Sequence, residues 1–323
     1  MSTWGYSYLA THPNEAKPSI PYQPGTTIKA QAYTPPKPPN FYYTWARGKI
    51  EKDIREIHPL QLCLENLPAE GHPRNRMIGL RIKRHVRVHD GANSQIVQAE
   101  FLSNQEKDPQ PLEGPIPTSI TVKFYDPLYY DFDTEHPDPF ANCDAAFAHE
   151  TLAYHHLKPV YGTVVPRFLG SYSIDVPLPG NPSVFRPVRA ILYEFVPGVS
   201  LQDIEIQDYS SSQRKAIMSA VLDAHSILRQ LNVAHGDLDP RNVIVISAKE
   251  GEKADIRLID FDMAECGKRI QEQHQPTMLP ESRSIIIKRW SDKDLRDCML
   301  DFAWLIDWPW DDWLENEYAK DRI

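Results

Sequence analysis

The chain has 323 residues, of which 41% are hydrophobic and 24% charged, and its formal net charge at pH 7 is −9. This composition is ordinary for a soluble globular protein, and the length allows one large hydrophobic core or two moderate ones. The negative charge, with no long basic run to offset it, argues against a nucleic-acid-binding protein.

Membrane and secretion signals are not evident in the sequence. No apolar stretch approaches the length that spans a bilayer, and the N-terminus lacks the basic-then-apolar order of a signal peptide. The four cysteines are widely spaced and form no C-x-x-C pair, which favours free thiols over a disulfide or a zinc site. We therefore expect a cytoplasmic protein with no membrane partner.

Residues 1–40 are rich in proline and end in 31-QAYTPPKPPN-40. They lack a sustained apolar period, so we expect an extended N-terminal arm. Two roles for this arm are open. Its aromatic residues could pack against the folded body, or 35-PPKP-38 could bind a protein partner.

Strand signals begin near residue 77, where apolar and basic residues alternate. A helical spacing of apolar residues follows the third strand, over 139–157. The resulting order, three strands, one helix and two more strands, predicts an antiparallel sheet with a single helix. The five predicted strands cover residues 77–91, 95–102, 119–126, 167–176 and 188–196.

The pattern turns helical after residue 197. Residues 211–232 place apolar side chains on one face of a helix, and two β-branched runs follow it. The tail, residues 293–321, has the pattern of a tryptophan-rich amphipathic helix that is interrupted at Pro309. We expect this second half to be mainly helical.

Three polar residues lie at fixed offsets beside these β-branched runs: Asp237, Asn242 and Asp260. Ionised carboxylates are costly to bury unless a cation meets them. Mg²⁺ takes one or two protein oxygens together with phosphate oxygens, and a further carboxylate can orient a hydroxyl nucleophile. The spacing therefore predicts a magnesium–phosphate site.

The segments that carry these residues, 235-HGDLDPRN-242 and 259-IDF-261, resemble the catalytic loop and metal-binding strand of the protein-kinase-like superfamily. The resemblance is closest to the branch of aminoglycoside phosphotransferases, choline kinases and fungal kinase-like proteins. It implies that Asp237 is the catalytic base and that Asn242 and Asp260 hold Mg²⁺.

Two upstream segments match the same family in the right order. The segment 121-TVKFYD-126 resembles the strand with the phosphate-anchoring lysine, which implies that role for Lys123. The segment 147-FAHETLAYHHL-157 resembles the helix whose glutamate pairs with that lysine, which implies Glu150. A hinge between two lobes is implied at 192-LYEFVPG-198, where the backbone of three residues would bind the adenine edge of ATP: Glu194, Phe195 and Val196.

The sequence departs from the family pattern in the phosphate-binding loop. The first hairpin offers only Gly91, in 88-VHDGANSQ-95, where several glycines would let backbone N–H groups approach phosphates. With a single glycine, this loop is expected to hold phosphates less well than a glycine-rich loop.

Other departures lie in and near the acidic loop. Gly236 stands where many protein kinases have arginine, and Asp239 stands where serine/threonine kinases have lysine. Asp239 could bind a cationic group or a second Mg²⁺, or it could be a solvated turn residue. We expect Arg241, two residues further on, to be one of the catalytic residues. Asp262 replaces a glycine, and it would be strained if that position needs a positive φ.

Together these observations predict an α+β, two-lobed kinase-like fold. The N-lobe (41–196) would hold the five-stranded antiparallel sheet and one helix, and the reduced C-lobe (197–323) would be mainly helical. Only about sixty residues follow Asp260, which favours a small-molecule hydroxyl substrate over a protein. The predicted function is an ATP- and Mg²⁺-dependent phosphotransferase. The alternatives are an inactive pseudokinase that acts as a binding or scaffold module, a protein kinase, or an enzyme that transfers AMP.

Overall fold

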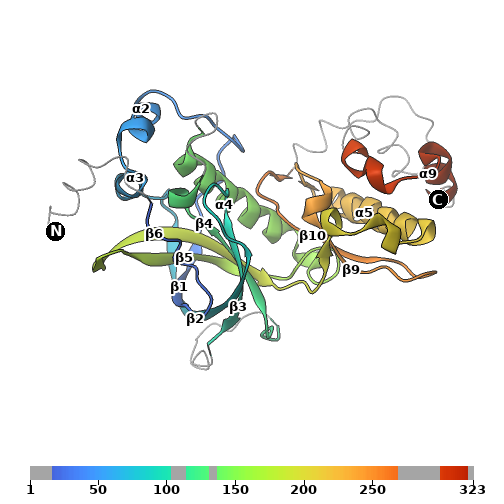
Figure 1. Ribbon diagram of the computed structural model, residues 1–323, viewed down its shortest axis with the longest axis horizontal. Helices are drawn as coiled ribbons and strands as arrows, with labels where there is room; N and C mark the ends of the chain where they lie inside the picture. Colours follow the sequence, from blue (N-terminus) through green and yellow to red (C-terminus); the bar gives the residue numbers. More distant parts are fainter. Residues whose placement is uncertain (1–16, 103–113, 131–136, 268–298, 319–323) are drawn as a thin grey trace. The chain divides into compact units, whose positions relative to one another are not determined.

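The computed structural model describes residues 17–102, 114–130, 137–267 and 299–318. The chain forms two compact units (Figure 1). The first comprises Met1–Leu152 and Phe168–Phe195, and the second comprises Ala153–Arg167 and Val196–Ile323. No helix in the described ranges is long and apolar enough to cross a membrane.

The first unit is built on a closed barrel of six antiparallel strands, in the order β1-β2-β3-β4-β6-β5. Alternate residues of each strand point inward and form one hydrophobic core, as the two-residue period of a strand dictates. The strands are β1 (Thr27–Thr34), β2 (His72–Arg87), β3 (Gln95–Phe101), β4 (Ile120–Tyr125), β5 (Phe168–Leu178) and β6 (Asn181–Glu194).

Strand β1 corrects two predictions. The sheet has six strands where five were expected, and residues 27–34 belong to the barrel although they were expected in an extended arm. β1 pairs with β2 from Thr27 to Thr34, and it joins β5 through two residue pairs, at Gln31 and Ala32. Two of the three inward positions of β1 carry alanine, so the apolar alternation of Ile28, Ala30 and Ala32 is a weak strand signal. Closure of the barrel supplies the burial.

Within the described residues, three α-helices accompany the barrel. The helix predicted over 139–157 is α4 (Pro139–His156), and it starts after Asp138, whose carboxylate accepts hydrogen bonds from two backbone N–H groups of the first turn. The short helices α2 (Lys49–Glu56) and α3 (Pro59–Glu65) were not predicted. At α3, His58 caps the N-terminus through its ring nitrogen.

A buried ion pair stands at the end of β4. The guanidinium of Arg186 donates to both carboxylate oxygens of Asp126, at 2.5 and 2.8 Å, and the Tyr22 hydroxyl donates to the same carboxylate at 2.5 Å. All three side chains are at most 4% exposed. Although burial opposes a charged guanidinium, the carboxylate of Asp126 raises the pKa of Arg186. The network joins the segment before β1 to β4 and β6.

The second unit centres on helix α5 (Ser211–Gln230). A capping box starts this helix: the Ser210 hydroxyl accepts from the Gln213 N–H, and the Gln213 side chain accepts from the Ser210 N–H. Short strands accompany it, in a three-stranded sheet of order β10-β9-β7 and a two-stranded sheet of order β11-β8, and β10 and β8 contact the helix. They are β7 (Val199–Ser200), β8 (Val233–Ala234), β9 (Val243–Ser247), β10 (Asp255–Leu258) and β11 (Glu265–Cys266).

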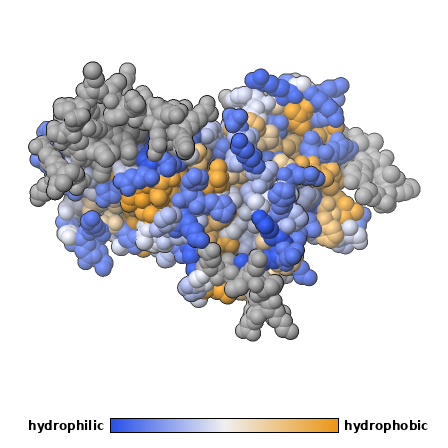
Figure 2. Space-filling view, turned by 180° about the vertical axis from the view of Figure 1, so that it is seen from behind, coloured by the Kyte–Doolittle hydropathy of each residue, from blue (hydrophilic) through white to orange (hydrophobic). Residues whose placement is uncertain are grey.

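The described part of the C-terminal segment is helical and interrupted, in agreement with the predicted break at Pro309. A 3-10 helix covers Met299–Leu305, and α9 (Trp310–Tyr318) begins immediately after the proline. The remainder of the predicted helix, residues 293–298 and 319–321, lies outside the described residues. Figure 2 shows hydrophobic residues in separate patches between hydrophilic ones on one face, as is common for protein surfaces.

Candidate active site

The first unit contains a buried lysine–glutamate pair. Lys123 on β4 and Glu150 on α4 approach to 2.7 Å between Nζ and Oε2, and neither side chain is more than 1% exposed. A buried charge is tolerated when an opposite charge is hydrogen-bonded to it. The structure therefore brings together the two residues that the family resemblance paired, and the phosphate-anchoring role of Lys123 stays a prediction.

A tyrosine that sequence reasoning missed joins this pair. The hydroxyl of Tyr125 donates to the same Glu150 oxygen, Oε2, at 2.6 Å. The available signal was its position two residues after Lys123, because residues i and i+2 of a strand share a face.

In the second unit the acidic loop is held by its own side chains. The amide nitrogen of Asn242 donates to the Asp237 carboxylate at 3.0 Å and to the Asp237 carbonyl at 2.9 Å. The five-residue spacing permits this contact because Asp239 caps a 3-10 turn over Pro240–Asn242 and accepts from the Arg241 N–H at 2.9 Å. Asn242 is buried, whereas the Asp237 side chain is one-third exposed.

Arg241 bridges two carboxylates of this loop. Its guanidinium lies 2.8 and 2.9 Å from the two Asp237 oxygens and 2.5 Å from an Asp239 oxygen. Although burial opposes it, the carboxylate of Asp237 raises the pKa of Arg241, so this side chain is a permanent cation beside the predicted base. The Arg241 side chain is 48% exposed, so the pairs add little to stability and mainly set geometry.

The loop is connected to the predicted metal ligand Asp260 through the residue before it. The Ile259 N–H donates to the Asn242 carbonyl at 3.0 Å, and His235 Nε2 lies 3.0 Å from the Ile259 carbonyl oxygen. A carbonyl only accepts, so Nε2 carries the proton, and burial lowers the pKa of His235 and keeps the ring neutral. The buried ring of Phe261 packs on the ring of His235 at 4.6 Å between centroids.

Asp260 itself has an unusual backbone. Its φ is +66°, in the left-handed region, and the only other non-glycine residue with positive φ in the described ranges is Asn232. The positive φ that the sequence analysis allowed for at Asp262 is therefore found at Asp260. Such a conformation costs about 1–3 kcal/mol and is typical of functional sites.

The absence of arginine at position 236 has a steric reason. Gly236 has φ +79°, and a Cβ built on it would lie 2.0 Å from the Met263 carbonyl oxygen. Any side chain would collide with this backbone, so only glycine fits beside Asp237.

The hairpin loop between β2 and β3 is tied down by hydrogen bonds. The buried Gln95 side chain accepts from the His89 N–H at 2.9 Å and donates to the His89 carbonyl at 2.8 Å. The Gly91 N–H donates to the Tyr129 carbonyl at 2.9 Å. Two backbone donors that a phosphate-binding loop would use already have partners.

Two comparisons with known proteins bear on this arrangement. The lipopolysaccharide kinase (Kdo/WaaP) family matches residues 190–316, which is less than half of the chain. "Probable serine/threonine-protein kinase fhkD" of Dictyostelium discoideum is 32% identical over 71 residues, which cover 22% of this chain and 9% of that protein. The chain therefore matches only a small part of that relative's length.

The chain resembles the protein-kinase-like superfamily. The expected kinship with aminoglycoside phosphotransferases and choline kinases stays a prediction, because the matching family is a different one.

In this kinase-like chain, residues 194–196 lie where the chain leaves the first unit. Glu194 ends β6, and the division falls between Phe195 and Val196. The Phe195 N–H donates to the Ser119 carbonyl at 3.2 Å. An adenine contact at this segment stays a prediction, and the Phe195 N–H would have to exchange its partner to make one.

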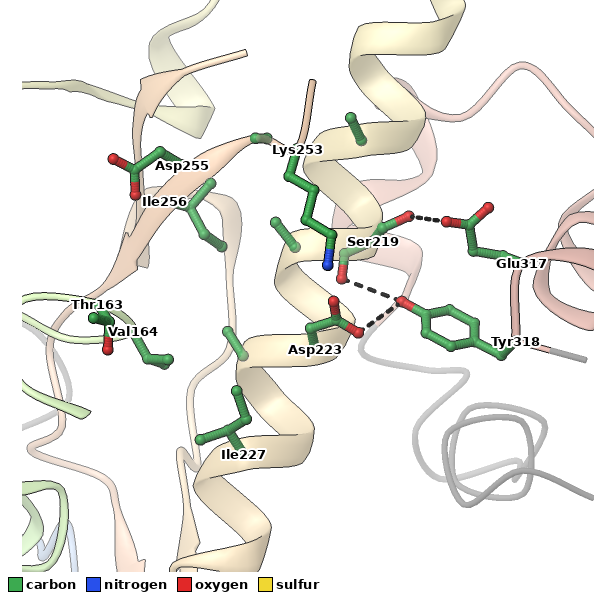
Figure 3. A pocket seen from close by; sticks show the side chains of 14 residues that line it. Thr163, Val164, Ser219, Asp223, Ile227, Lys253, Asp255, Ile256, Glu317 and Tyr318 are labelled. Carbon is green, nitrogen blue, oxygen red and sulfur yellow. Dashed lines mark hydrogen bonds between the residues drawn. The ribbon is translucent and has the colours of Figure 1, made fainter. Parts of the chain in front are cut away.

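The kinase-like chain also has a cavity that involves none of the predicted site residues. A space of about 480 Å³ in the second unit lies among α5, the start of β10 and the end of α9 (Figure 3). The Tyr318 hydroxyl donates to the Asp223 carboxylate at 3.1 Å and to the Ser219 carbonyl at 3.2 Å, and Lys253 extends toward these residues. The cavity therefore lies where α9 packs on α5.

Proposed function

We propose that the chain is an ATP- and Mg²⁺-dependent phosphotransferase that acts on a hydroxyl group of a small molecule. The observation that carries this proposal is the joined set of Asp237, Asn242 and Asp260, in which Asp260 is held in a strained left-handed conformation. Strain beside hydrogen-bonded polar groups is typical of a site that is organised for function and not for stability alone.

The residues present fit Mg²⁺. The nitrogen of the Asn242 amide faces two acceptors of Asp237, so the amide oxygen is the atom that could coordinate a cation. Asp260 supplies a carboxylate, and one or two protein oxygens plus phosphate oxygens are what Mg²⁺ takes. When bound, the metal would neutralise charge on the transferring phosphoryl group.

The remaining residues would position the reactants. Asp237 would accept a hydrogen bond from the substrate hydroxyl, and Arg241 would hold the Asp237 carboxylate in orientation. Lys123, held by Glu150, would neutralise charge on the phosphates of the nucleotide. Phosphoryl transfer needs little more than this positioning and charge stabilisation.

The comparisons support different substrate classes. The name of the lipopolysaccharide kinase family supports an acceptor other than a protein, whereas the Dictyostelium discoideum relative is named a probable serine/threonine-protein kinase. We favour the small-molecule acceptor because the family match, over residues 190–316, spans more of this chain than the 71 residues matched to that relative.

A pseudokinase is the second candidate, and the hairpin loop favours it. The His89 and Gly91 N–H groups are bound within the protein, so the loop offers fewer donors to phosphates than a glycine-rich loop does. A protein that binds no nucleotide would act as a binding or scaffold module.

Thermal unfolding with and without Mg²⁺ and ATP separates these candidates. A ligand at a hundred times its Kd stabilises the folded state by about 2.7 kcal/mol, which raises Tm by several degrees. We expect this shift to need Mg²⁺ and to disappear in Asp260→Asn. The matched control is Asp255→Asn, an exposed aspartate on β10, which should keep the shift.

No shift for the wild type at millimolar ATP would overturn the phosphotransferase proposal and favour the pseudokinase. If the shift occurs, an ATP-consumption screen over amino alcohols, aminoglycosides, sugars and generic proteins identifies the acceptor class. Turnover of the proteins alone would overturn the small-molecule proposal.

A further inference from the structure

Tyr125 shares one carboxylate oxygen with the lysine of the predicted site. Glu150 Oε2 accepts from Lys123 Nζ at 2.7 Å and from the Tyr125 hydroxyl at 2.6 Å. The Tyr125 side chain is 2% exposed, so this bond forms out of contact with water. Hydrogen bonds to a charged acceptor in a dry environment are among the strongest in proteins.

Secondary-structure geometry makes this contact specific. Lys123 and Tyr125 lie two residues apart on β4 and reach the same side chain, since alternate strand residues share a face. Phe147 and Glu150 lie three residues apart on α4 and also share a face. The Tyr125 ring packs edge-on against Phe147 at 5.6 Å between centroids. This contact limits the positions of the ring and favours the one in which its hydroxyl reaches Glu150.

The lysine contacts the same tyrosine. Lys123 Nζ lies 5.4 Å from the centre of the Tyr125 ring, within the range of a cation–π contact. Tyr125 therefore touches both members of the ion pair, Glu150 through its hydroxyl and Lys123 through its ring. A phenylalanine would keep the packing on Phe147 and lose only the hydroxyl.

We propose that Tyr125 is a positioning residue that orients the Glu150 carboxylate and thereby sets where the Lys123 ammonium meets the phosphates of ATP. This inference rests on the proposed function, since it assigns Tyr125 a role in nucleotide binding. The tyrosine hydroxyl fixes the carboxylate from a second direction. Loss of the Tyr125 hydroxyl removes one of the hydrogen bonds that hold Glu150 Oε2 beside the Lys123 ammonium.

The test compares Tyr125→Phe with the wild type in binding Mg²⁺–ATP and adenosine, measured by calorimetry at a temperature where both proteins are folded. Lys123 would act on phosphates, which adenosine lacks. We expect the Kd for Mg²⁺–ATP to rise about tenfold and the Kd for adenosine to change less than twofold. In a Lys123→Met background, Tyr125→Phe should change the Kd for Mg²⁺–ATP less than twofold, because the two residues act through one contact.

Tyr172→Phe is the matched control. Tyr172 is a buried barrel tyrosine whose hydroxyl donates to the Leu169 carbonyl at 3.1 Å, so its loss removes a similar hydrogen bond from the same unit. We expect it to lower Tm without changing either Kd.

The outcomes separate this inference from the proposed function. Equal weakening of both ligands by Tyr125→Phe, or no weakening of Mg²⁺–ATP, would overturn the positioning role while the proposed function stands. A wild type that binds no Mg²⁺–ATP would overturn the proposed function, and the inference with it.

Discussion

Gly236 and Asp260 show how single backbone positions shape the acidic site. Both have φ near +70°, but for different reasons. Glycine adopts this conformation without a steric penalty, and at Gly236 the Met263 carbonyl also leaves no room for a side chain. At Asp260 the side chain makes the left-handed conformation energetically unfavourable. The site is thus built from one position that must be glycine and one that accepts strain.

We expect Gly236→Ala to lower the free energy of unfolding by about 3 kcal/mol or more, because left-handed strain and a backbone collision add together. Gly251→Ala is the control, since Gly251 has φ +75° and no atom within 4 Å of the added Cβ. It should cost about 1 kcal/mol. Urea unfolding of the two variants gives the comparison, and equal costs would refute the collision.

At the scale of elements, strand β1 decides the shape of the first unit. It lies between β2 and β5 and closes the barrel. Its central residue Ala30 is fully buried, whereas the adjacent Lys29 faces the exterior and is exposed. The alternation predicts that the same substitution costs much more stability at the buried position than at the exposed neighbour.

Ala30→Asp should destabilise the first unit by about 3 kcal/mol or more, because it places an unpaired carboxylate in the barrel core. Lys29→Asp introduces the same side chain on the outer face and should cost about 1 kcal/mol or less. Chemical denaturation of both variants measures the difference. Similar stability for the two would show that residues 27–34 are not a strand of the barrel in solution.

On the scale of the whole molecule, each unit has its own buried core. The barrel core gathers inward side chains of all six strands, and in the second unit one face of α5 is buried with Val245, Leu258 and Phe261. Units with separate cores can open separately. The Asp126–Arg186 pair belongs to the first unit alone.

Arg186→Met tests this independence. Removing one member of a buried ion pair costs about 3–5 kcal/mol, because it leaves a carboxylate without its cation. We expect hydrogen exchange to accelerate in the barrel strands while the amides of α5 keep their protection. Arg81→Met, which removes a half-exposed arginine from β2, should change neither. Equal loss of protection in α5 would show that the molecule opens as one unit.

Local patterns predicted the elements whose residues have strong periods or strong family motifs. The helix over 139–157, the strands with alternating apolar residues and the acidic loop are in this class. Helices α2 and α3 and strand β1 were missed. α2 and α3 are shorter than the ten to twelve residues that periodicity needs, and β1 has alanines on its inner face.

The sequence by itself determined which residues carry charge and at what spacing, since Asp237, Asn242 and Asp260 are read directly from the chain. It also determined the strand-and-helix order that brings Lys123 near Glu150. Only the tertiary structure decided the closed barrel, the strain at Asp260 and the contact of Tyr125 with Glu150. These depend on which faces meet in space, and packing between distant segments cannot be read from the local pattern of any one of them.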